Sequence, residues 1–361
     1  MRHLVSQALD KMEDVVDHLS DLVQLPFSPP LSLKEALLRL HRPLPGLTLE
    51  SRALVEARQR LAFEELLAHH LSLSRHRSRI RTQVAPDISL ARADIQEFCQ
   101  KLPFALTGAQ QRVVDEILQD MTRGMPMMRL VQGDVGCGKT VVAAIAALAA
   151  IRSGYQVAVM APTDLLADQH AQSFRQWLNP LGIQVGFISG RLRGEERNRA
   201  LQDLSKGPTG LAVGTHALFQ DDITFANLGL VIIDEQHRFG VHQRLALRSK
   251  GIHSGHVPHQ LIMTATPIPR TLAMTGYADL DLSIIDERPP GRTPVKTAVL
   301  PQARKPEIME RIEEWVRKGR QAYWVCTLIE ESEALEAEAA ETAAATLREA
   351  LPDVRMALVH G

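Results

Sequence analysis

Six short apolar segments alternate with helix-forming stretches between residues 102 and 290, and this alternation limits the possible folds most strongly. The segments are rich in Val and Ile and are bounded by turn residues: MRLVQG (128–133), QVAVMAP (156–162), QVGFIS (184–189), GLAVGT (210–215), LVIIDE (230–235) and QLIMTAT (260–266). Near-continuous apolar runs are typical of strands buried on both faces of a parallel sheet. We therefore expect a doubly wound α/β domain over 102–290, with functional residues just beyond the carboxyl ends of its strands.

The first of these strands runs into GDVGCGKT, which has the spacing of a phosphate-binding P-loop. Glycines let successive backbone N–H groups face phosphate oxygens, Lys139 reaches the β- and γ-phosphates, and the Thr140 hydroxyl binds Mg²⁺. The Ala-rich stretch 141–151 predicts a helix whose N-terminus faces the phosphates, which favours this interpretation over a chance glycine-rich turn. Every residue of the loop is a candidate nucleotide contact: Gly133, Asp134, Val135, Gly136, Cys137, Gly138, Lys139 and Thr140.

Two adjacent carboxylates, Asp234 and Glu235, follow the buried segment LVII. A carboxylate at the end of a buried strand is costly unless it has a partner. Beside a P-loop, that partner is Mg²⁺ for Asp234, while Glu235 polarises the attacking water. The alternative is that Asp234 caps the next helix; the P-loop upstream favours the metal.

Polar clusters also follow three other strands, at 161–169, 214–217 and 264–270. Each cluster taken alone fits ordinary turn and N-cap chemistry. Their order along the chain, together with the P-loop and DEQH (234–237), is what makes the pattern specific.

Residues 1–101 predict helices separated by proline-rich turns. SLKE (32–35) has the spacing of a capping box that starts a helix ending near Leu40, and HRPLPG (41–46) stops that helix. A long helix follows from about residue 50 to residue 73, with the basic tail SRHRSRIR (74–81). That tail fits either a solvated face or a contact with the phosphate backbone of a nucleic acid.

Composition excludes several classes of protein. Of 361 residues, 45% are apolar and 23% are charged, with a net charge of −1, which indicates a globular protein whose nucleic-acid contacts must come from local patches. No apolar run approaches the length of a membrane span, and the first residues do not form a signal peptide. The three cysteines have no metal-ligand spacing, so we expect a reducing, cytoplasmic location.

The motifs GDVGCGKT, APTDLLADQH, VGTHALFQ, DEQH and TATPIPRTL resemble, in this order, motifs I, Ia, Ib, II and III of superfamily-2 helicases. The longer strings IIDEQHRFGVHQR, LIMTATPIPRTLAMTGYADLDLSIIDERPPGRTPV and GRQAYWVCTLIEESE closely resemble the RecG family of bacterial ATP-dependent DNA helicases. The transcription-repair coupling factors share TATPIPRTL but typically carry DEEQRFGV where this chain has DEQHRFGV.

The resemblance implies a RecA-like motor domain and gives roles to matching residues. Gly133 to Thr140 hold the phosphates of ATP, and Asp234 and Glu235 serve Mg²⁺ and the attacking water. The residues implied to couple the nucleotide to DNA are His237, Thr264 and Thr266. The residues implied to contact the DNA backbone are Pro162, Thr163, Gly214, Thr215 and His216.

Phe104 and Gln110 occupy the position that reads adenine in the family, with an aromatic face for stacking and an amide for the base edge. Thr107 and Gln110 also have the spacing of a capping box, so capping alone would explain the glutamine. A further departure is Cys137, where related sequences commonly have Ser. A thiol beside a helix N-terminus is expected to have a lowered pKa.

The third region, residues 291–361, predicts the start of a second RecA-like domain, with strands at TAVLP (297–301), QAYWVCT (321–327) and RMALVH (355–360). The family's motifs V and VI, its N-terminal wedge and its C-terminal element are not found in the chain. We therefore expect an internal fragment in which Met1 need not be a native start, and which hydrolyses ATP poorly by itself.

Together these patterns predict a monomeric, ATP- and Mg²⁺-dependent translocase that remodels branched double-stranded DNA, such as replication forks and Holliday junctions, in recombination and repair, without contact to membranes. The alternatives are a motor like the coupling factor, an RNA helicase, or a nucleotide-gated DNA-binding module that does not turn ATP over. Intact Lys139, Asp234 and Glu235 disfavour the last alternative, and the RecG-like strings disfavour the RNA helicase.

Overall fold

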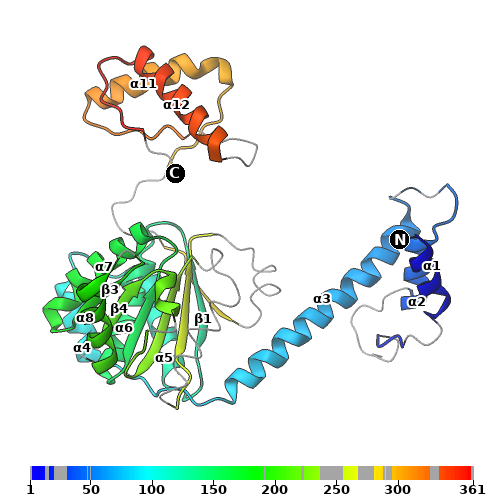
Figure 1. The fold of residues 1–361 in the computed structure, drawn as a ribbon, viewed down its shortest axis with the longest axis horizontal. Helices are drawn as coiled ribbons and strands as arrows, with labels where there is room; N and C mark the ends of the chain where they lie inside the picture. Colours follow the sequence, from blue (N-terminus) through cyan, green and yellow to red (C-terminus); the bar gives the residue numbers. More distant parts are fainter. Residues whose placement is uncertain are drawn as a thin grey trace. The chain divides into compact units, whose positions relative to one another are not determined.

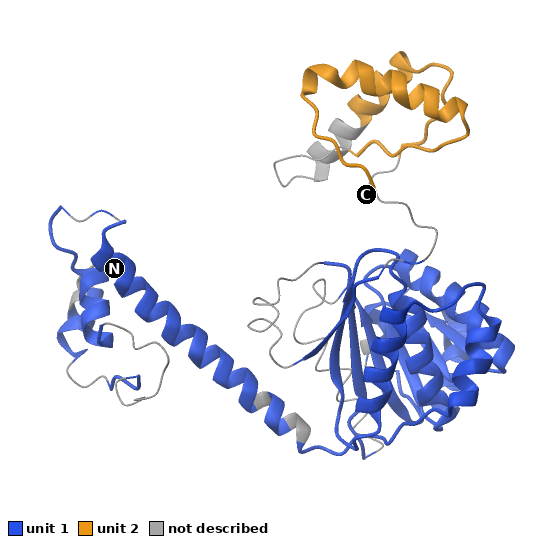
Figure 2. Ribbon diagram, turned by 180° about the vertical axis from the view of Figure 1, so that it is seen from behind, with its two compact units in different colours: residues 1–292 blue, residues 293–361 orange. Residues whose placement is uncertain are grey.

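The structure of the chain is a computed structural model, which describes residues 2–12, 16–19, 31–46, 48, 50–190, 192–207, 209–220, 223–235, 255–266, 280–287, 289, 295–325 and 333–358. It divides into two compact units, residues 1–292 and residues 293–361 (Figure 2). None of the helices in the described part of the chain combines the length and the hydrophobicity that a membrane span requires.

A seven-stranded sheet with helices packed around it forms the α/β part of the first unit (Figure 1), with the strand order β3-β4-β2-β5-β6-β1-β7. Its strands are β1 (Met128–Gly133), β2 (Gln156–Met160), β3 (Val185–Ile188), β4 (Leu211–Gly214), β5 (Leu228–Asp234), β6 (His259–Thr264) and β7 (Asp281–Ile285). Every pair of neighbours is parallel. The predicted parallel α/β fold is confirmed. Strands β1 to β4 lie within the predicted apolar segments, and β5 and β6 overlap theirs but begin two residues and one residue earlier. The seventh strand, β7, is an addition that the sequence analysis did not foresee.

Alternate residues of the central strands enter two separate cores, because successive side chains of a strand point to opposite faces. Val131, Val157 and Val159 pack on one face with the helices α5 (Gly108–Met121), α6 (Lys139–Arg152) and α7 (Asp164–Leu178). Their neighbours Leu130 and Ala158 pack on the other face. On that second face, Leu204 of α8 (Gly194–Lys206) packs against Ile188 and Ala212, together with the short 3₁₀ helix η3 (His216–Phe219). The sheet is therefore covered from both sides.

Helix α6 is buried along most of its length. All ten residues from Val141 to Ala150 are buried, so the helix is apolar all round rather than on one stripe. Six of those ten are alanines, whose small side chains let neighbouring helices and strands pack closely around the helix axis. The segment that follows the glycine-rich loop is thereby held firmly in the core, which fixes the position of the loop itself.

The helices that precede the sheet are α1 (Arg2–Asp10), α2 (Leu33–His41), α3 (Arg52–Arg81) and α4 (Arg92–Lys101). The predicted capping box at Ser32 is confirmed: its hydroxyl accepts from Glu35 N, and the Glu35 carboxylate accepts from Ser32 N. The basic tail 74–81 continues α3 as a regular helix. Within that tail Arg77 forms an ion pair with Asp281 at the start of β7, so at least one of its cations has a partner inside the protein.

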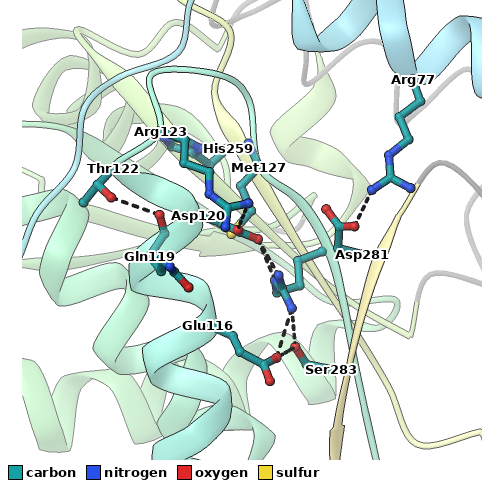
Figure 3. A network of polar contacts seen from close by, with 11 residues as sticks. Arg77, Glu116, Gln119, Asp120, Thr122, Arg123, Met127, His259, Asp281 and Ser283 are labelled. Carbon is teal, nitrogen blue, oxygen red and sulfur yellow. Dashed lines mark hydrogen bonds and ion pairs between the residues drawn. The ribbon is translucent and has the colours of Figure 1, made fainter.

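A buried polar network attaches the edge strand β7 to β1 and α5 (Figure 3). Arg129 of β1 donates through Nε to Asp120 at 2.9 Å, and through Nη1 to Glu116 at 3.0 Å and to Ser283 at 2.6 Å. The Ser283 hydroxyl also donates to Glu116. The buried ion pair of Arg129 and Asp120 joins β1 to α5, and Ser283 joins β7 to Arg129 and Glu116, so the network favours one position for the edge strand.

The connection between α3 and α4 crosses the amino ends of the strands and is held there by His259, the first residue of β6. His259 is fully buried; its Nδ1 accepts from Met127 N at 3.0 Å, so Nε2 carries the proton and donates to Pro86 O at 2.8 Å. Ala85 N and Ile88 N add backbone bonds to Gly124 O and Met121 O. Burial lowers the pKa of His259, because the charged imidazolium is disfavoured away from water.

We predict that His259 makes the fold sensitive to mild acid. Its pKa is lowered in the folded state, so its contribution to stability is complete above the unfolded value of about 6.5 and is lost as the pH falls below it. The loss by pH 5.5 is at most about 1.4 kcal/mol. The free energy of unfolding, measured with urea at pH 7.5 and at pH 5.5, should fall less between these pH values for His259→Asn than for the unsubstituted protein. The asparagine keeps an acceptor for Met127 N. Equal differences in the two proteins would contradict the prediction.

The second unit contains η6 (Gln302–Arg304), α11 (Lys305–Arg317) and α12 (Glu333–Ala350). The strands expected at 297–301, 321–327 and 355–360 are not formed in the parts of these segments that the structure describes. Val299, Tyr323 and Val325 are instead exposed. A strand is stabilised by pairing and by cross-strand contacts, and no strand pairing is formed by residues 297–301, 321–325 and 355–358. This expectation was therefore wrong for the described residues.

Candidate nucleotide and DNA site

The carboxyl ends of the strands lie along one edge of the sheet, because every ladder is parallel. The candidate residues follow five of these ends: the loop 133–138 after β1, Pro162 after β2, Thr215 after β4, Asp234 at the end of β5 and Thr264 at the end of β6. The fold therefore places the motifs, which are spread over more than a hundred residues of sequence, on the same side of the molecule.

The loop between β1 and α6 has the backbone conformation that its glycines predict. Gly136 and Gly138 adopt left-handed φ values of 76° and 89°. Within the loop, Cys137 N donates to Asp134 O at 3.1 Å, and α6 begins at Lys139. The loop thus ends at the N-terminus of a 14-residue helix, where free backbone N–H groups and the helix dipole favour an anion.

Lys139 folds back over the loop. Its Nζ donates to Gly133 O at 2.6 Å and to Asp134 O at 3.2 Å. Both acceptors are neutral carbonyls of the loop, so the ammonium charge stays within the loop and close to where phosphates would lie. Lys139 therefore holds the loop closed as well as supplying a positive charge to it.

Gln110 connects the start of α5 to this loop. Its side-chain oxygen accepts from Thr107 N at 2.8 Å, and the Thr107 hydroxyl accepts from Gln110 N at 3.2 Å, which confirms the capping box. The amide nitrogen of the same side chain donates to Cys137 O at 2.8 Å. Gln110 is buried, and a Cβ at Gly138 would lie 2.2 Å from its Nε2. The glutamine and the loop are therefore packed as one piece.

Phe104 lies just before α5 with part of its ring exposed. The ring meets Trp177 of α7 edge to face, with centroids 6.3 Å apart and planes at 83°. With 44% of the residue exposed, an aromatic face remains accessible close to Gln110 in sequence. A carboxylate that the sequence analysis missed also reaches this helix start: Glu287, just after β7, accepts from Ala109 N at 3.0 Å.

Cys137 differs from its expected behaviour. Its residue is buried, and a Cβ at Gly133 would lie 2.4 Å from its Sγ, so the sulfur fills the space beside that glycine. Burial raises the pKa of the thiol, and this effect outweighs the opposing charge of Lys139. The expectation of a lowered pKa was wrong, because the position of the thiol in the core decides its chemistry.

Asp234 ends β5 with its carboxylate held by a histidine of α7. Asp234 Oδ2 lies 2.7 Å from His170 Nε2, and both residues are 9% exposed. No role was predicted for His170, although it is the last residue of the APTDLLADQH motif. The alternative role for Asp234, capping the next helix, falls on residues outside those that the structure describes.

Glu235 reaches across to the end of β6. Its Oε1 accepts from Ala265 N at 3.0 Å and its Oε2 accepts from the Thr264 hydroxyl at 3.3 Å. Thr264 Oγ1 in turn accepts from Thr266 N at 3.1 Å. Glu235 is the one described residue other than glycine with a positive φ, 51°, which costs energy for a side chain with a Cβ. The third coupling candidate, His237, lies outside the described residues.

The candidate DNA contacts divide into exposed and buried groups. Thr163 caps α7 through a bond from Leu166 N to its hydroxyl, and His216 is exposed at the start of η3. Thr215 is buried, and its hydroxyl finds no hydrogen-bond partner among the described residues. Gly214 has a packing role, since a Cβ there would lie 2.2 Å from Ile188 O of the neighbouring strand.

These residues fit a nucleotide with Mg²⁺. A strand, a loop with left-handed glycines and a helix N-terminus form the cradle, and adding a Cβ at Gly133 or Gly138 would fill space that the loop needs for Cys137 and Gln110. Carboxylate and hydroxyl oxygens are the ligands that Mg²⁺ prefers. Asp234 and Thr140 would hold the metal, and the loop with Lys139 would hold the phosphates.

Comparison with known proteins gives a consistent result. Residues 107–275 match the sequence model of the DEAD/DEAH box helicase family. The whole chain is 54% identical to the ATP-dependent DNA helicase RecG of Pasteurella multocida and 53% identical to that of Escherichia coli K12, and it covers 52% of each. The chain thus spans about half the length of the curated relatives that it matches.

A solved structure described as RecG bound to a three-way DNA junction is 36% identical to the chain. It matches with a TM-score of 0.76 over 93% of the chain and 42% of that structure. A DUF1998 helicase, MrfA, shares the fold at 16% identity, with a TM-score of 0.52 over 73% of the chain and 42% of that structure. The RecG resemblance expected from the motifs is confirmed, and the sheet has the RecA-like fold of helicase motors.

Proposed function

We propose that this chain is the nucleotide-binding part of an ATP-dependent DNA helicase of the RecG type, which couples ATP hydrolysis to the remodelling of branched double-stranded DNA. The observation that carries the proposal is that five motif segments lie at the carboxyl ends of the strands of one parallel sheet. The whole-chain identity to RecG helicases supports the DNA substrate over the alternatives of a coupling factor or an RNA helicase.

The residues of the loop 133–140 bind the phosphates of ATP in this proposal. Backbone N–H groups and the N-terminus of α6 face the phosphate oxygens, and Lys139 exchanges its bonds to Gly133 O and Asp134 O for phosphate oxygens. Thr140 and Asp234 hold Mg²⁺, which when bound neutralises charge on the β- and γ-phosphates. Phe104 stacks on the adenine, and Gln110 reads its edge.

Glu235 orients and polarises the attacking water, and its contacts suit a coupling role. Its bonds to Thr264 and Ala265 connect the catalytic carboxylate to the end of β6. A movement of the Glu235 carboxylate therefore changes the hydrogen bonds at the end of β6. Thr264, Thr266 and His237 transmit that change. Pro162, Thr163, Gly214, Thr215 and His216 lie at the ends of β2 and β4 and contact the DNA backbone; the buried hydroxyl of Thr215 requires a local rearrangement to do so.

Three-way junctions, forks and Holliday junctions share one feature, a point where duplex arms meet, and they are the substrates we propose. The support is the similarity to a RecG structure bound to a three-way junction. We propose a monomeric motor that works in the cytoplasm; the free thiols of Cys99 and Cys137 fit a reducing compartment.

Lys139→Ala tests the proposal directly. The substitution is made in the full-length natural protein that contains this chain. We expect it to abolish both ATP turnover and the ATP-dependent conversion of a synthetic fork. The fold should survive, because Lys139 bonds only to loop carbonyls among the contacts described here. Lys206→Ala, at the exposed end of α8, is the matched control and should behave as the unsubstituted protein. Near-normal turnover by Lys139→Ala would show that the loop is not the phosphate site.

Glu235→Gln should separate binding from hydrolysis. The amide keeps the shape of the side chain and an acceptor for Ala265 N, while it can no longer act as a base. Loss of general base catalysis should lower turnover about 10²–10⁴-fold, with affinity for ATP–Mg²⁺ retained. Fluorescence titration with a labelled ATP analogue gives the affinity. A parallel fall of affinity and turnover would make Glu235 a structural or metal-binding residue instead.

Gln110→Glu distinguishes adenine recognition from capping alone. A glutamate still completes the capping box, whereas it loses the amide hydrogens. The glutamine oxygen has a second lone pair and its nitrogen a second hydrogen beyond the bonds to Thr107 and Cys137, which could bind a base. Because Gln110 is buried, base recognition requires a local rearrangement. We expect the preference for ATP over GTP to fall about tenfold, by roughly 1.4 kcal/mol. Equal weakening of both nucleotides would leave Gln110 with the loop and cap contacts only.

A further inference from the structure

His170 occupies a position on α7 that the helix otherwise fills with apolar side chains. The buried residues of that helix are Ala167, His170, Ala171, Phe174 and Leu178, which form a single stripe facing the core. The imidazole ring lies 6.4 Å from the ring of Phe174. A polar side chain in such a stripe needs a partner, and here the partner is the carboxylate of Asp234.

The bond between the two side chains has a definite direction and is shielded from water. An ionised carboxylate can only accept, so His170 Nε2 carries a proton and donates to Asp234 Oδ2, at a length of 2.7 Å. Side-chain exposure is 11% for the histidine and 13% for the aspartate. A bond of this kind is stronger than an exposed pair and restricts the rotation of the carboxylate.

We propose that His170 is a positioning residue for the metal: it holds the Asp234 carboxylate in the orientation in which it serves Mg²⁺ beside ATP. A carboxylate has two oxygens and about four lone-pair sites, so the bond to His170 leaves capacity for a metal or a metal-bound water. Partners that orient a ligating side chain commonly change metal affinity by about 10–100-fold when removed. The inference rests on the proposed ATP–Mg²⁺ site.

The bond between His170 and Asp234 joins two elements that are distant in sequence. Asp234 ends β5, whereas His170 lies in the middle of a 15-residue helix on a different part of the chain, 64 residues earlier. Helix α7 starts directly after Pro162 and Thr163, two of the proposed DNA contacts. The Asp234 carboxylate is therefore oriented by helix α7, and the first turn of the same helix borders the proposed DNA contacts.

The test compares His170→Gln with His170→Asn. The glutamine amide nitrogen takes the place of Nε2 and can still donate to Asp234, whereas the asparagine amide takes the place of Nδ1 and is too short to do so. For each protein, the melting temperature is measured with ATP while Mg²⁺ is varied, and again with ATP and EDTA. The melting temperature without ligand serves as the control for folding.

We expect His170→Asn to raise the Mg²⁺ concentration at half-maximal stabilisation about tenfold. His170→Gln should stay within about twofold of the unsubstituted protein, and stabilisation by ATP in EDTA should be the same in all three. Unchanged Mg²⁺ midpoints in both variants would overturn the proposal and leave His170 as a core residue that only satisfies Asp234.

A measurement on the unsubstituted protein covers the case in which a variant does not fold. With ¹⁵N-labelled histidine, the Nε2 signal of His170 should shift when Mg²⁺ is added to the ATP complex, and an unmoved signal would overturn the proposal. Failure of the ATP site itself looks different: neither the unsubstituted protein nor Lys139→Ala would then be stabilised by ATP–Mg²⁺. If only Lys139→Ala loses that stabilisation, the site stands and His170 alone is under test.

Discussion

The parallel pairing of all seven strands is the constraint on which the rest of the structure depends. Parallel strands need a crossover between them, and the crossovers α6, α7 and α8 bury both faces of the sheet. The candidate functional residues then gather at the strand ends, whereas the Arg129 network lies along β1 and the edge strand β7. The buried helix α6 fixes the glycine-rich loop at one such end, and Asp234 and Thr264 follow at the ends of β5 and β6.

Three hydrogen-bonded links join the motifs across that edge. Gln110 connects the start of α5 to the loop at Cys137, His170 connects α7 to Asp234, and Glu235 connects the end of β5 to Thr264 and Ala265. Each link joins elements that are distant in sequence. The proposed nucleotide, metal and DNA contacts are therefore linked, so a shift of one element would change the hydrogen bonds of the next, as the proposed motor requires.

Most patterns local in sequence could be predicted, whereas the strands expected at 297–301, 321–327 and 355–360 and the features that depend on distant contacts could not. The six apolar strands and the capping boxes at Ser32 and Thr107 are local, and the structure confirms them. Strand β7 was missed because it lies at an edge with Asp281 and Ser283 facing a polar network, so it has no continuous apolar run. His170 was missed because no local pattern marks its partner. The pKa of Cys137 depends on burial, which spacing does not reveal.

Hydrogen–deuterium exchange of the chain with and without ATP–Mg²⁺ tests most directly whether the nucleotide lies on the β1–α6 loop. We expect slower exchange at the backbone N–H groups of residues 136 and 138–140, because these would donate to phosphate oxygens, and at the start of α5 around Gln110. The backbone N–H groups of β7, beside the Arg129 network, should exchange at the same rate with and without ATP–Mg²⁺. Unchanged exchange in the loop, or protection confined to the amino ends of the strands near His259, would contradict the account.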